Sequence, residues 1–290
     1  MGVNVVWCRP EWVRFAGADW LDHIMTVPTP DRFHAKQGRS IGRWTLTDPD
    51  GRSIVVYLKR HYELPRRHAV GGRFFPRQSW SPGLQEFDHL RWAEQQGLPV
   101  PRVWAMAEFR GSKLQSCLAV EELAGMLPLH EAIPLAFDRL EPAAFDAWKA
   151  GLIDEMARLT RELHRRRRFH NDLYLCHFYI AEADTAVPQD QWRDRVVMID
   201  FHRLQQRRLG WTWGVLKDVA QLLYSANVPG ITPDDLRRFW DAYRGGDWGD
   251  VAPPPAWLWR PIQWKAARYQ RHHDRKESRK LIPVEAPPHP

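Results

Sequence analysis

The chain has 290 residues, which fits two domains or one two-lobed unit, and its 44% hydrophobic and 27% charged residues exclude a disordered, collagenous or fibrous protein. No apolar run reaches the roughly 18 residues of a membrane-spanning helix, and the amino terminus lacks the basic and apolar regions of a signal peptide. The three cysteines are too few and too scattered for a disulfide framework or a zinc site, so we expect a cytoplasmic protein.

The charge balance favours an anionic partner. Lys and Arg number 42 against 35 Asp and Glu, which gives a net charge of +7, and arginine binds phosphate and carboxylate through paired hydrogen bonds. Nucleic acid, an anionic membrane surface and a phosphorylated or acidic substrate all fit this balance. An arginine-rich composition without a binding role fits it as well, so the choice depends on the motifs.

The first part of the chain has an extended pattern. Residues 1–30 lack periodicity, and we interpret them as an N-terminal extension. From Arg39 to Lys59, two β-rich runs flank the turn Asp48-Pro49-Asp50-Gly51, and Asp-Gly in such a turn predicts a β-hairpin. Residues 60–83 are rich in glycine, proline and basic side chains, and we expect a loop or a short irregular helix there.

One helix and two further strands follow. Apolar residues at helical spacing predict a helix over Leu84–Gly97 that ends at the glycine and carries Glu86 in its first turn. Extended runs at 100–108 and 118–122 predict the strands.

The second part is mostly helical. A long buried helix is predicted by apolar residues that recur every three or four positions, namely Phe145, Trp148, Leu152, Met156, Leu159 and Leu163. Two short β-like runs at 176–180 and 196–199 come next, and then a buried helix around 215–223. Another helix begins at Thr232, with Pro233 in its first position. These patterns predict an α+β, bilobal chain with a small β-rich N-lobe over 31–123 and a larger α-helical C-lobe over 124–290.

Four residues with ionisable side chains occur along the chain in an order that is typical of one fold. Lys59 ends a strand, Glu86 lies in the next helix, Asp172 follows the long helix in His170-Asn171-Asp172, and Asp200 ends an apolar run. Each of these residues, taken alone, could have only a structural role, as an exposed lysine or a loop histidine commonly has. Their order is that of a protein-kinase-like fold, in which a lysine and its carboxylate partner position nucleotide phosphates. One aspartate then faces the acceptor hydroxyl and another holds Mg²⁺ on the phosphates.

The flanking residues resemble one kinase family. His170–Phe178 is similar to the H-[RN]-D-x-Y-x-C-H-F catalytic loop of the Kdo/WaaP-type lipopolysaccharide kinases, and Ile199–Gln205 resembles their I-D-L-H-R-x-Q segment. The segments Val56–His61, Lys217–Ala226 and Thr232–Tyr243 resemble that family as well. The Tyr-x-Cys-His-Phe string is specific to it, because it is not a general kinase feature.

The resemblance implies an activity, its cofactors and an acceptor. The reaction would be ATP- and Mg²⁺-dependent phosphorylation of a heptose or 3-deoxy-octulosonate (Kdo) hydroxyl in the lipopolysaccharide inner core, on the core itself or a lipid A-core precursor. Asp172 would be the catalytic aspartate, Asp200 the Mg²⁺ ligand, and Lys59 with Glu86 the phosphate-positioning pair. The linker whose backbone meets adenine would be Glu121, Glu122 and Leu123.

Some positions depart from ordinary kinases. His177 stands where protein kinases place a metal-binding Asn, so it is either a metal ligand or a hydrogen-bonding loop residue. The nucleotide-covering loop is expected near Lys36–Trp44, although only two glycines are present there. Tyr57 lies on the strand face of Lys59 and would crowd or stack on adenine. His170 and Asp218 are expected to be structural, with Asp218 bracing the catalytic loop.

The segment after Asp200 bears on the substrate class. Asp218 follows Asp200 by only 18 residues without an A-P-E motif, which argues against a docked peptide and hence against an atypical Ser/Thr protein kinase. A cluster of arginines in this segment suits an anionic sugar, although plain surface arginines remain an alternative; these are Arg203, Arg207 and Arg208. A catalytically dead scaffold or nucleic-acid-binding module is the third reading. The joint presence of the kinase residues argues against it, and we expect no nucleic-acid partner.

The carboxyl-terminal tail suggests a membrane contact. Basic residues recur there beside Trp264 and Tyr269; they are Lys265, Arg268, Arg271, Arg275, Lys276, Arg279 and Lys280. We expect peripheral, salt-sensitive association with an anionic leaflet at the inner membrane. The alternative is a solvated helix that simply packs on the second lobe.

Overall fold

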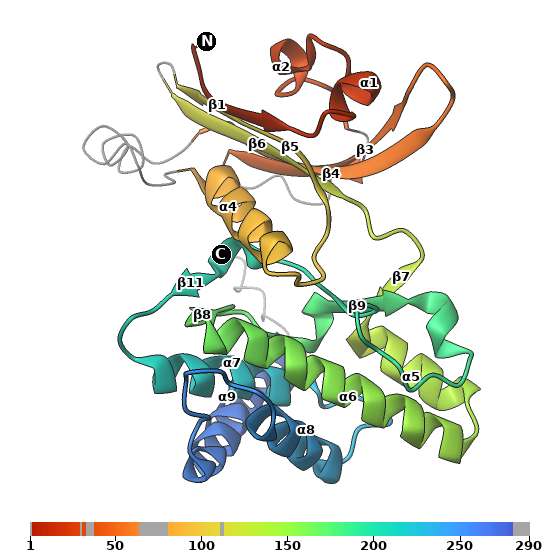
Figure 1. Cartoon of the computed structure of the whole chain (residues 1–290), viewed down its shortest axis with the longest axis vertical. Helices are drawn as coiled ribbons and strands as arrows, with labels where there is room; N and C mark the ends of the chain where they lie inside the picture. The colour runs from red at the N-terminus through yellow and green to blue at the C-terminus, as the bar shows by residue number, and fades with distance from the viewer. Residues whose placement is uncertain (1, 30, 33–37, 64–80, 111–112, 281–290) are drawn as a thin grey trace, which may run out of the picture. The chain divides into compact units, whose positions relative to one another are not determined.

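Residues 2–29, 31–32, 38–63, 81–110 and 113–280 are described by the structure, a computed structural model (Figure 1). The chain divides into two units. Unit 1 comprises Met1–Met126 and Val197–Leu204, and unit 2 comprises Leu127–Val196 and Gln205–Pro290. The strand-rich pattern of the first part and the helical pattern of the second therefore correspond to separate bodies, and the short run that carries Asp200 belongs to the first.

A six-stranded antiparallel sheet forms unit 1, in the order β1-β5-β6-β4-β3-β2. Its strands are β1 (Gly2–Cys8), β2 (Asp31–Arg32), β3 (Arg39–Thr47), β4 (Ser53–His61), β5 (Val103–Arg110) and β6 (Leu114–Glu121). The residues interpreted as an extension thus supply β1, which pairs with β5 across about a hundred residues of sequence. A pairing of such long range leaves no signal in the local sequence.

The two faces of the sheet have different coverings, as Figure 1 shows. Helices α1 (Trp12–Ala16) and α2 (Trp20–His23) bury a core cluster against one face. Helix α4 (Pro82–Gln95) covers the other, and the Ser81 hydroxyl caps its first turn. Successive side chains of a strand point to opposite faces, so β4 directs Val56 and Leu58 into the core cluster and Lys59 toward α4.

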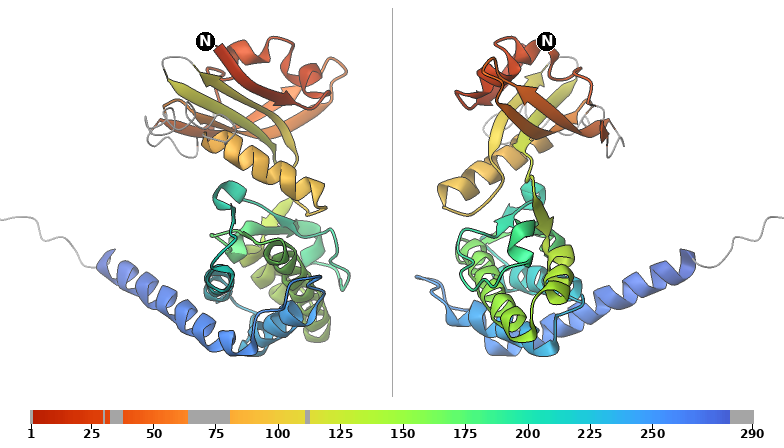
Figure 2. Two further views of the ribbon diagram at one scale, coloured as in Figure 1. Left: turned by 60° about the vertical axis from the view of Figure 1, so that its left-hand side comes forward. Right: turned by 90° about the vertical axis from the view of Figure 1, so that its right-hand side faces the viewer.

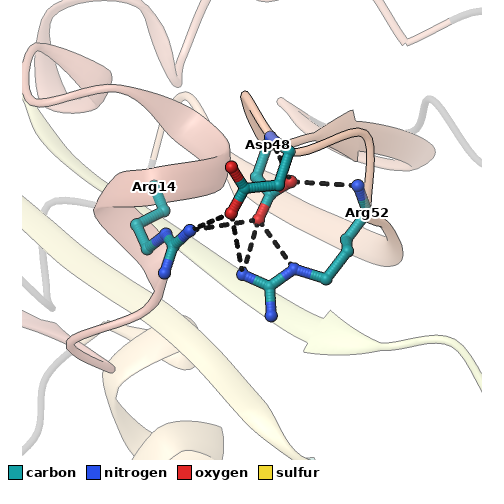
Figure 3. A network of polar contacts seen from close by, with 4 residues as sticks. Arg14, Asp48 and Arg52 are labelled. Atoms are coloured by element: carbon teal, nitrogen blue, oxygen red, sulfur yellow. Dashed lines mark hydrogen bonds and ion pairs between the residues drawn. The ribbon is translucent and has the colours of Figure 1, made fainter.

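The predicted hairpin between β3 and β4 is confirmed, and a buried carboxylate closes its turn (Figure 3). Asp48 accepts hydrogen bonds from the backbone N–H groups of Asp50 and Arg52, at 3.0 and 2.9 Å, and from the Arg52 guanidinium at 2.8 Å. Burial opposes ionisation, but the hydrogen bonds from Arg52 outweigh it and hold the pKa of Asp48 below its usual value. Arg14 of α1 joins this network through an ion pair with Asp48.

A buried arginine on β4 holds the segment that leads from α2 to β2. The Arg60 guanidinium donates to the Val27 carbonyl at 2.7 Å and to the Thr29 hydroxyl at 2.9 Å. Arg60 is 1% exposed and Thr29 4%, whereas Val27 is only partly buried, so the Thr29 hydroxyl depends on a protein donor in place of water. These contacts fix the N-terminal residues onto the sheet that carries Lys59.

Five helices make up most of unit 2, namely α5 (Leu129–Arg139), α6 (Pro142–Arg165), α7 (Trp211–Ser225), α8 (Pro233–Gly245) and α9 (Trp259–Lys280). Its shorter elements are β7 (Met126–Pro128), β8 (Arg168–Phe169), β9 (Phe178–Ala181), β11 (Gln205–Gln206), η1 (Leu175–His177), η2 (Glu182–Thr185) and η4 (Ala256–Leu258). The short elements β10 (Val197–Met198) and η3 (Phe201–Arg203) belong to unit 1. All six apolar residues that predict the long helix are buried on α6.

The start of α8 agrees with the sequence pattern. Thr232 and Asp235 form a reciprocal capping box at the start of α8. Helix α9 packs on α7 and buries Ile262 and Ala266, so the described part of the tail lies on unit 2. Its carboxyl-terminal end projects from the other helices (Figure 2). Four predicted tail residues lie outside the described side chains, namely Arg275, Lys276, Arg279 and Lys280.

Replacing the buried guanidinium should destabilise unit 1. We expect Arg60→Met to lower the free energy of unfolding by several kcal/mol, at about 1–3 kcal/mol for each buried acceptor left without a donor. Chemical denaturation measures the change. Lys113→Met, which removes an exposed ion pair with Glu63, serves as the control and should cost less than about 1 kcal/mol. Equal stability of the two variants would contradict the structural role of Arg60.

Candidate active site

The predicted lysine–glutamate pair is formed within unit 1. Lys59 near the end of β4 places its Nζ 2.5 Å from Oε1 of Glu86 on α4. Helix α4 begins two residues earlier than predicted, so Glu86 lies in its second turn, where it is 5% exposed. A carboxylate this buried requires a charged or hydrogen-bonding partner, and Lys59 supplies it.

Asp200 lies beside this pair in the same unit. Its backbone adopts a left-handed conformation, with φ 65°, at the start of η3, which an aspartate tolerates better than most residues. His89 of α4 bonds the Phe201 carbonyl at 2.8 Å and thereby holds η3 against the helix of Glu86. The hydrogen bond to Asp200 raises the pKa of His202 against the effect of burial, and the charges of Glu86 and Lys59 also act on that imidazole.

The predicted adenine linker is partly engaged within the protein. The Glu121 N–H donates to the Arg102 carbonyl at 2.8 Å, and the Glu122 N–H donates to the Val55 carbonyl at 3.0 Å. Hydrogen bonds from Arg43 lower the pKa of Glu122 despite burial, and the Tyr57 hydroxyl also bonds this carboxylate. Of the three linker residues, Leu123 is the one whose carbonyl accepts a turn hydrogen bond, from Met126 at 3.2 Å.

The expected nucleotide-covering loop lies only partly in the described chain. Lys36 is outside the described residues, and Gly42 lies within β3. A Cβ at Gly42 would stand 2.2 Å from the Thr29 hydroxyl, the same hydroxyl that Arg60 holds. The close approach of Thr29 therefore explains this glycine without a nucleotide.

In unit 2, the loop that carries Asp172 is held by Asp218, as the sequence predicts. One Asp218 oxygen accepts the His170 N–H at 2.7 Å, and the other accepts the Asn171 N–H at 2.9 Å. Asp218 and His170 are fully buried. The two amides immediately precede Asp172, so the Asp218 carboxylate fixes the direction in which the chain enters Asp172.

Two residues without a sequence signal complete this network. His164 of α6 bonds Asp218 through Nε2 at 3.2 Å and the Tyr243 hydroxyl through Nδ1 at 2.6 Å. Because the carboxylate can only accept, Nε2 of His164 carries the proton. Burial raises the pKa of Tyr243 well above its usual value, so its hydroxyl keeps a proton to donate to Nδ1.

Asn171 has a conformational reason to replace the arginine of ordinary kinases. Its φ is 66°, a left-handed conformation in which Asn is strongly favoured over long side chains. Its side-chain oxygen accepts hydrogen bonds from Arg207 at 3.1 Å and from Lys217 at 3.3 Å. The structure therefore brings predicted Arg207 to the loop of Asp172, together with Lys217, which has no predicted role.

The other predicted substrate-binding arginines are placed differently. Arg203 is exposed on η3 of unit 1. Arg208 is exposed in unit 2, and its backbone carbonyl accepts a hydrogen bond from Arg167 at 3.3 Å. Strand β11, which pairs with β8, fixes the start of this arginine segment beside Phe169.

His177 has the tautomer of a metal-binding histidine. Its Nδ1 lies 2.7 Å from the Asp172 carbonyl oxygen, so Nδ1 donates, and in the neutral imidazole Nε2 is the acceptor nitrogen. Histidines that ligate metals commonly donate their other N–H in this way. Among the residues that the structure describes, no cluster of three or more His, Cys, Asp or Glu side chains could hold a metal by itself. A Mg²⁺ bound through one carboxylate and substrate phosphates needs no such cluster, and Asp200 fits that role.

Comparison with known proteins decides the family. The model of the lipopolysaccharide kinase (Kdo/WaaP) family matches residues 56–243, which include Lys59, Asp172 and Asp200. The chain belongs to this family. It is a protein-kinase-like, ATP-dependent sugar kinase, and the predicted fold class is confirmed.

Individual relatives agree with this assignment. The kinase is similar to the lipopolysaccharide core heptose(I) kinase WaaP of Pseudomonas aeruginosa, with 29% identity over 240 residues, 81% of this chain and 85% of the relative. It shares 32% identity over 98 residues with the WaaP of Escherichia coli K12, a match that covers 33% of this chain and 36% of the relative. A solved structure of WaaP in complex with acyl carrier protein matches with a TM-score of 0.65 and 25% identity, covering 91% of this chain and 99% of that one.

Removal of the Asp218 carboxylate should affect both stability and activity. Asp218→Ala leaves two buried N–H groups without an acceptor, at about 1–3 kcal/mol each, so we expect a lower melting temperature together with loss of phosphotransfer. Asp218→Asn keeps one oxygen acceptor, so its melting temperature and its transfer activity should lie between those of Asp218→Ala and the wild type. Thermal unfolding and a transfer assay measure the two effects. Lost activity with unchanged stability would mean that Asp218 acts on substrate directly.

A second prediction concerns the stability of unit 1 in acid. Burial, and then the positive charge of Arg39, lower the pKa of His61 from 6.5 to about 4. The unfolded chain therefore takes up the proton first, and stability should fall as the pH drops from about 6.5 toward 4, by up to roughly 1.4 kcal/mol per pH unit. His61→Gln should flatten this slope in denaturation experiments, whereas the exposed control His130→Gln should not. If the stability of all three proteins fell with pH at the same slope, the predicted role of His61 would be contradicted.

Proposed function

We propose that this kinase transfers the γ-phosphoryl group of ATP to a heptose hydroxyl in the lipopolysaccharide inner core, with the acceptor carried on a lipid A-core precursor. The family match supports the reaction class. The heptose(I) kinases among its relatives favour heptose over Kdo. The observations on which the proposal chiefly rests are the Lys59–Glu86 ion pair in unit 1, the unit that also contains Asp200, and the loop of Asp172 that Asp218 holds within unit 2.

Unit 1 supplies the groups that bind the nucleotide. Lys59, oriented by Glu86, neutralises phosphate charge, and Asp200 provides the carboxylate for Mg²⁺. When bound, the cation offsets the negative charge on the transferred group. The N–H groups of Glu121 and Glu122 already donate to protein carbonyls, so we assign the backbone N–H contact with adenine to Leu123.

Unit 2 supplies the groups that bind the acceptor. Asp172 orients the attacking sugar hydroxyl and accepts its proton as the oxygen bonds to the γ-phosphorus, while the bond from that phosphorus to the bridging oxygen breaks and ADP leaves. Its loop is held from one side by Asp218 and stabilised on the other by His177, which we retain as a candidate metal ligand through Nε2. Arg207 and Arg208, with Arg203 of unit 1, are the proposed contacts for carboxylate or phosphate groups of the core.

The acceptor chemistry also suggests where the kinase works. Within the described residues, no helix is long and apolar enough to cross a membrane. Lipopolysaccharide precursors are anchored by acyl chains, so the enzyme must reach a lipid surface. We therefore propose peripheral association at the cytoplasmic face of the inner membrane.

Loss of the proposed catalytic aspartate should separate chemistry from binding. We expect Asp172→Ala to reduce transfer from labelled ATP to core oligosaccharide by about a hundredfold or more, with ATP affinity and melting temperature unchanged. Asp138→Ala, which removes an exposed carboxylate of α5, is the matched control. A folded Asp172→Ala enzyme that transfers at the wild-type rate would remove Asp172 from the mechanism.

Removal of the proposed metal ligand should change the Mg²⁺ dependence of ATP affinity. Asp200→Asn removes the negative charge that binds the cation, so the gain in ATP affinity on adding Mg²⁺ should largely disappear. Calorimetric titration of ATP with and without Mg²⁺ measures this gain, and Asp50→Asn on the hairpin turn is the control. An unchanged metal dependence in Asp200→Asn would contradict the assignment.

A further inference from the structure

The most exposed large hydrophobic side chains of the described chain are concentrated in one part of unit 2. Leu209 is 89% exposed, Trp257 65%, Trp264 61% and Trp213 55%. All four lie just before or within α7 and α9 or the 3₁₀ helix that precedes α9. A single exposed apolar residue needs no explanation, but several large ones together mark an interaction surface.

One cation–aromatic contact joins α7 to α9, and two more lie along α9 itself. Nζ of Lys265 lies 4.4 Å from the centre of the Trp213 ring and 5.4 Å from that of Tyr269. The Arg268 guanidinium lies 5.9 Å from the Trp264 ring. Burial and the charge of Arg268 lower the pKa of Lys265, which places these two cations within electrostatic reach of each other.

The exposed face of α9 combines tryptophan with positive charge. Arg260, Trp264, Arg268 and Arg271 follow at intervals of four, four and three residues, so they lie on one side of the helix. Ile262 and Ala266, on the other side, are buried. Between Trp259 and Asp274 the helix has four basic residues and one acidic residue, Asp274, which bonds Gln270.

We propose that Leu209, Trp213, Trp264, Lys265 and Arg268 form a docking surface for an anionic lipid bilayer. Tryptophan is favoured at the headgroup level of membranes, where its ring is apolar and its N–H stays hydrated. Lys and Arg beside it attract anionic headgroups. A soluble acidic protein would complement the positive charge of this surface. It would not account for Leu209, an apolar side chain that is 89% exposed. This inference rests on the proposed function, because that function supplies the lipid-linked acceptor.

The surface can be tested without the reaction. Wild-type protein is sedimented with vesicles of phosphatidylcholine and with vesicles in which about a third of the lipid is phosphatidylglycerol, at low and high salt. We expect binding to the anionic vesicles that weakens at high salt. Leu209→Ser combined with Trp264→Ser should lower the partition coefficient at least tenfold, and Arg268→Gln should reduce its salt dependence. The matched controls are Phe137→Ser, a half-exposed aromatic on α5, and Arg237→Gln on α8.

Two activity measurements separate this surface from the reaction. The Leu209→Ser, Trp264→Ser variant should phosphorylate delipidated core oligosaccharide at the wild-type rate but act much more slowly on acceptor embedded in vesicles. Absence of wild-type vesicle binding, with transfer to the delipidated acceptor intact, would overturn the surface and leave the proposed function standing. Binding of purified acyl carrier protein, lost in the double variant, without any vesicle binding would overturn it in favour of a protein partner.

Discussion

The buried carboxylate of Asp218 is the contact on which the catalytic loop depends. An ionised carboxylate without access to water needs hydrogen-bond donors. Asp218 receives them from the backbone of His170 and Asn171 and from the imidazole of His164. Tyr243 fixes the tautomer of that imidazole, so three helices, α6, α7 and α8, contribute to one anchor. The chain therefore reaches Asp172 along a path set by the packed interior of unit 2.

The alternation of side chains along β4 provides the corresponding constraint in unit 1. Arg60 turns inward to hold the N-terminal residues, and its neighbour Lys59 turns to the opposite face, where Glu86 and α4 lie. A shift of β4 by one residue would exchange the two faces. The Lys59–Glu86 ion pair thus depends on the same register that builds the core, and the buried Arg60 helps to hold that register.

Residues with local or motif signals could be predicted from the sequence. The hairpin around Asp48, the apolar stripe of α6 and the Thr232 cap are set by neighbours a few residues away. The place of Lys59 and Glu86 in a kinase-like order predicts their pairing, and Asp218 is predicted separately as the residue that braces the catalytic loop.

Other features depend on contacts between distant residues and had no such signal. The Tyr243 hydroxyl meets His164 across 79 residues of sequence, and Lys217 meets Asn171 across 46. The pairing of β1 with β5 is similarly remote, so residues 1–30 looked like an extension although they supply an edge of the sheet. The left-handed backbone at Asn171 explains its departure from the usual arginine only once the loop geometry is known.

The central claim is that this kinase phosphorylates a heptose of the lipopolysaccharide inner core. The most direct measurement incubates the wild-type enzyme with labelled ATP, Mg²⁺ and two core oligosaccharides, one with heptose and one with Kdo alone, and maps the phosphate by mass spectrometry. The account predicts phosphate on a heptose hydroxyl of the first acceptor and none on the second. Phosphate on Kdo alone, or on a protein serine or threonine with neither sugar modified, would contradict it.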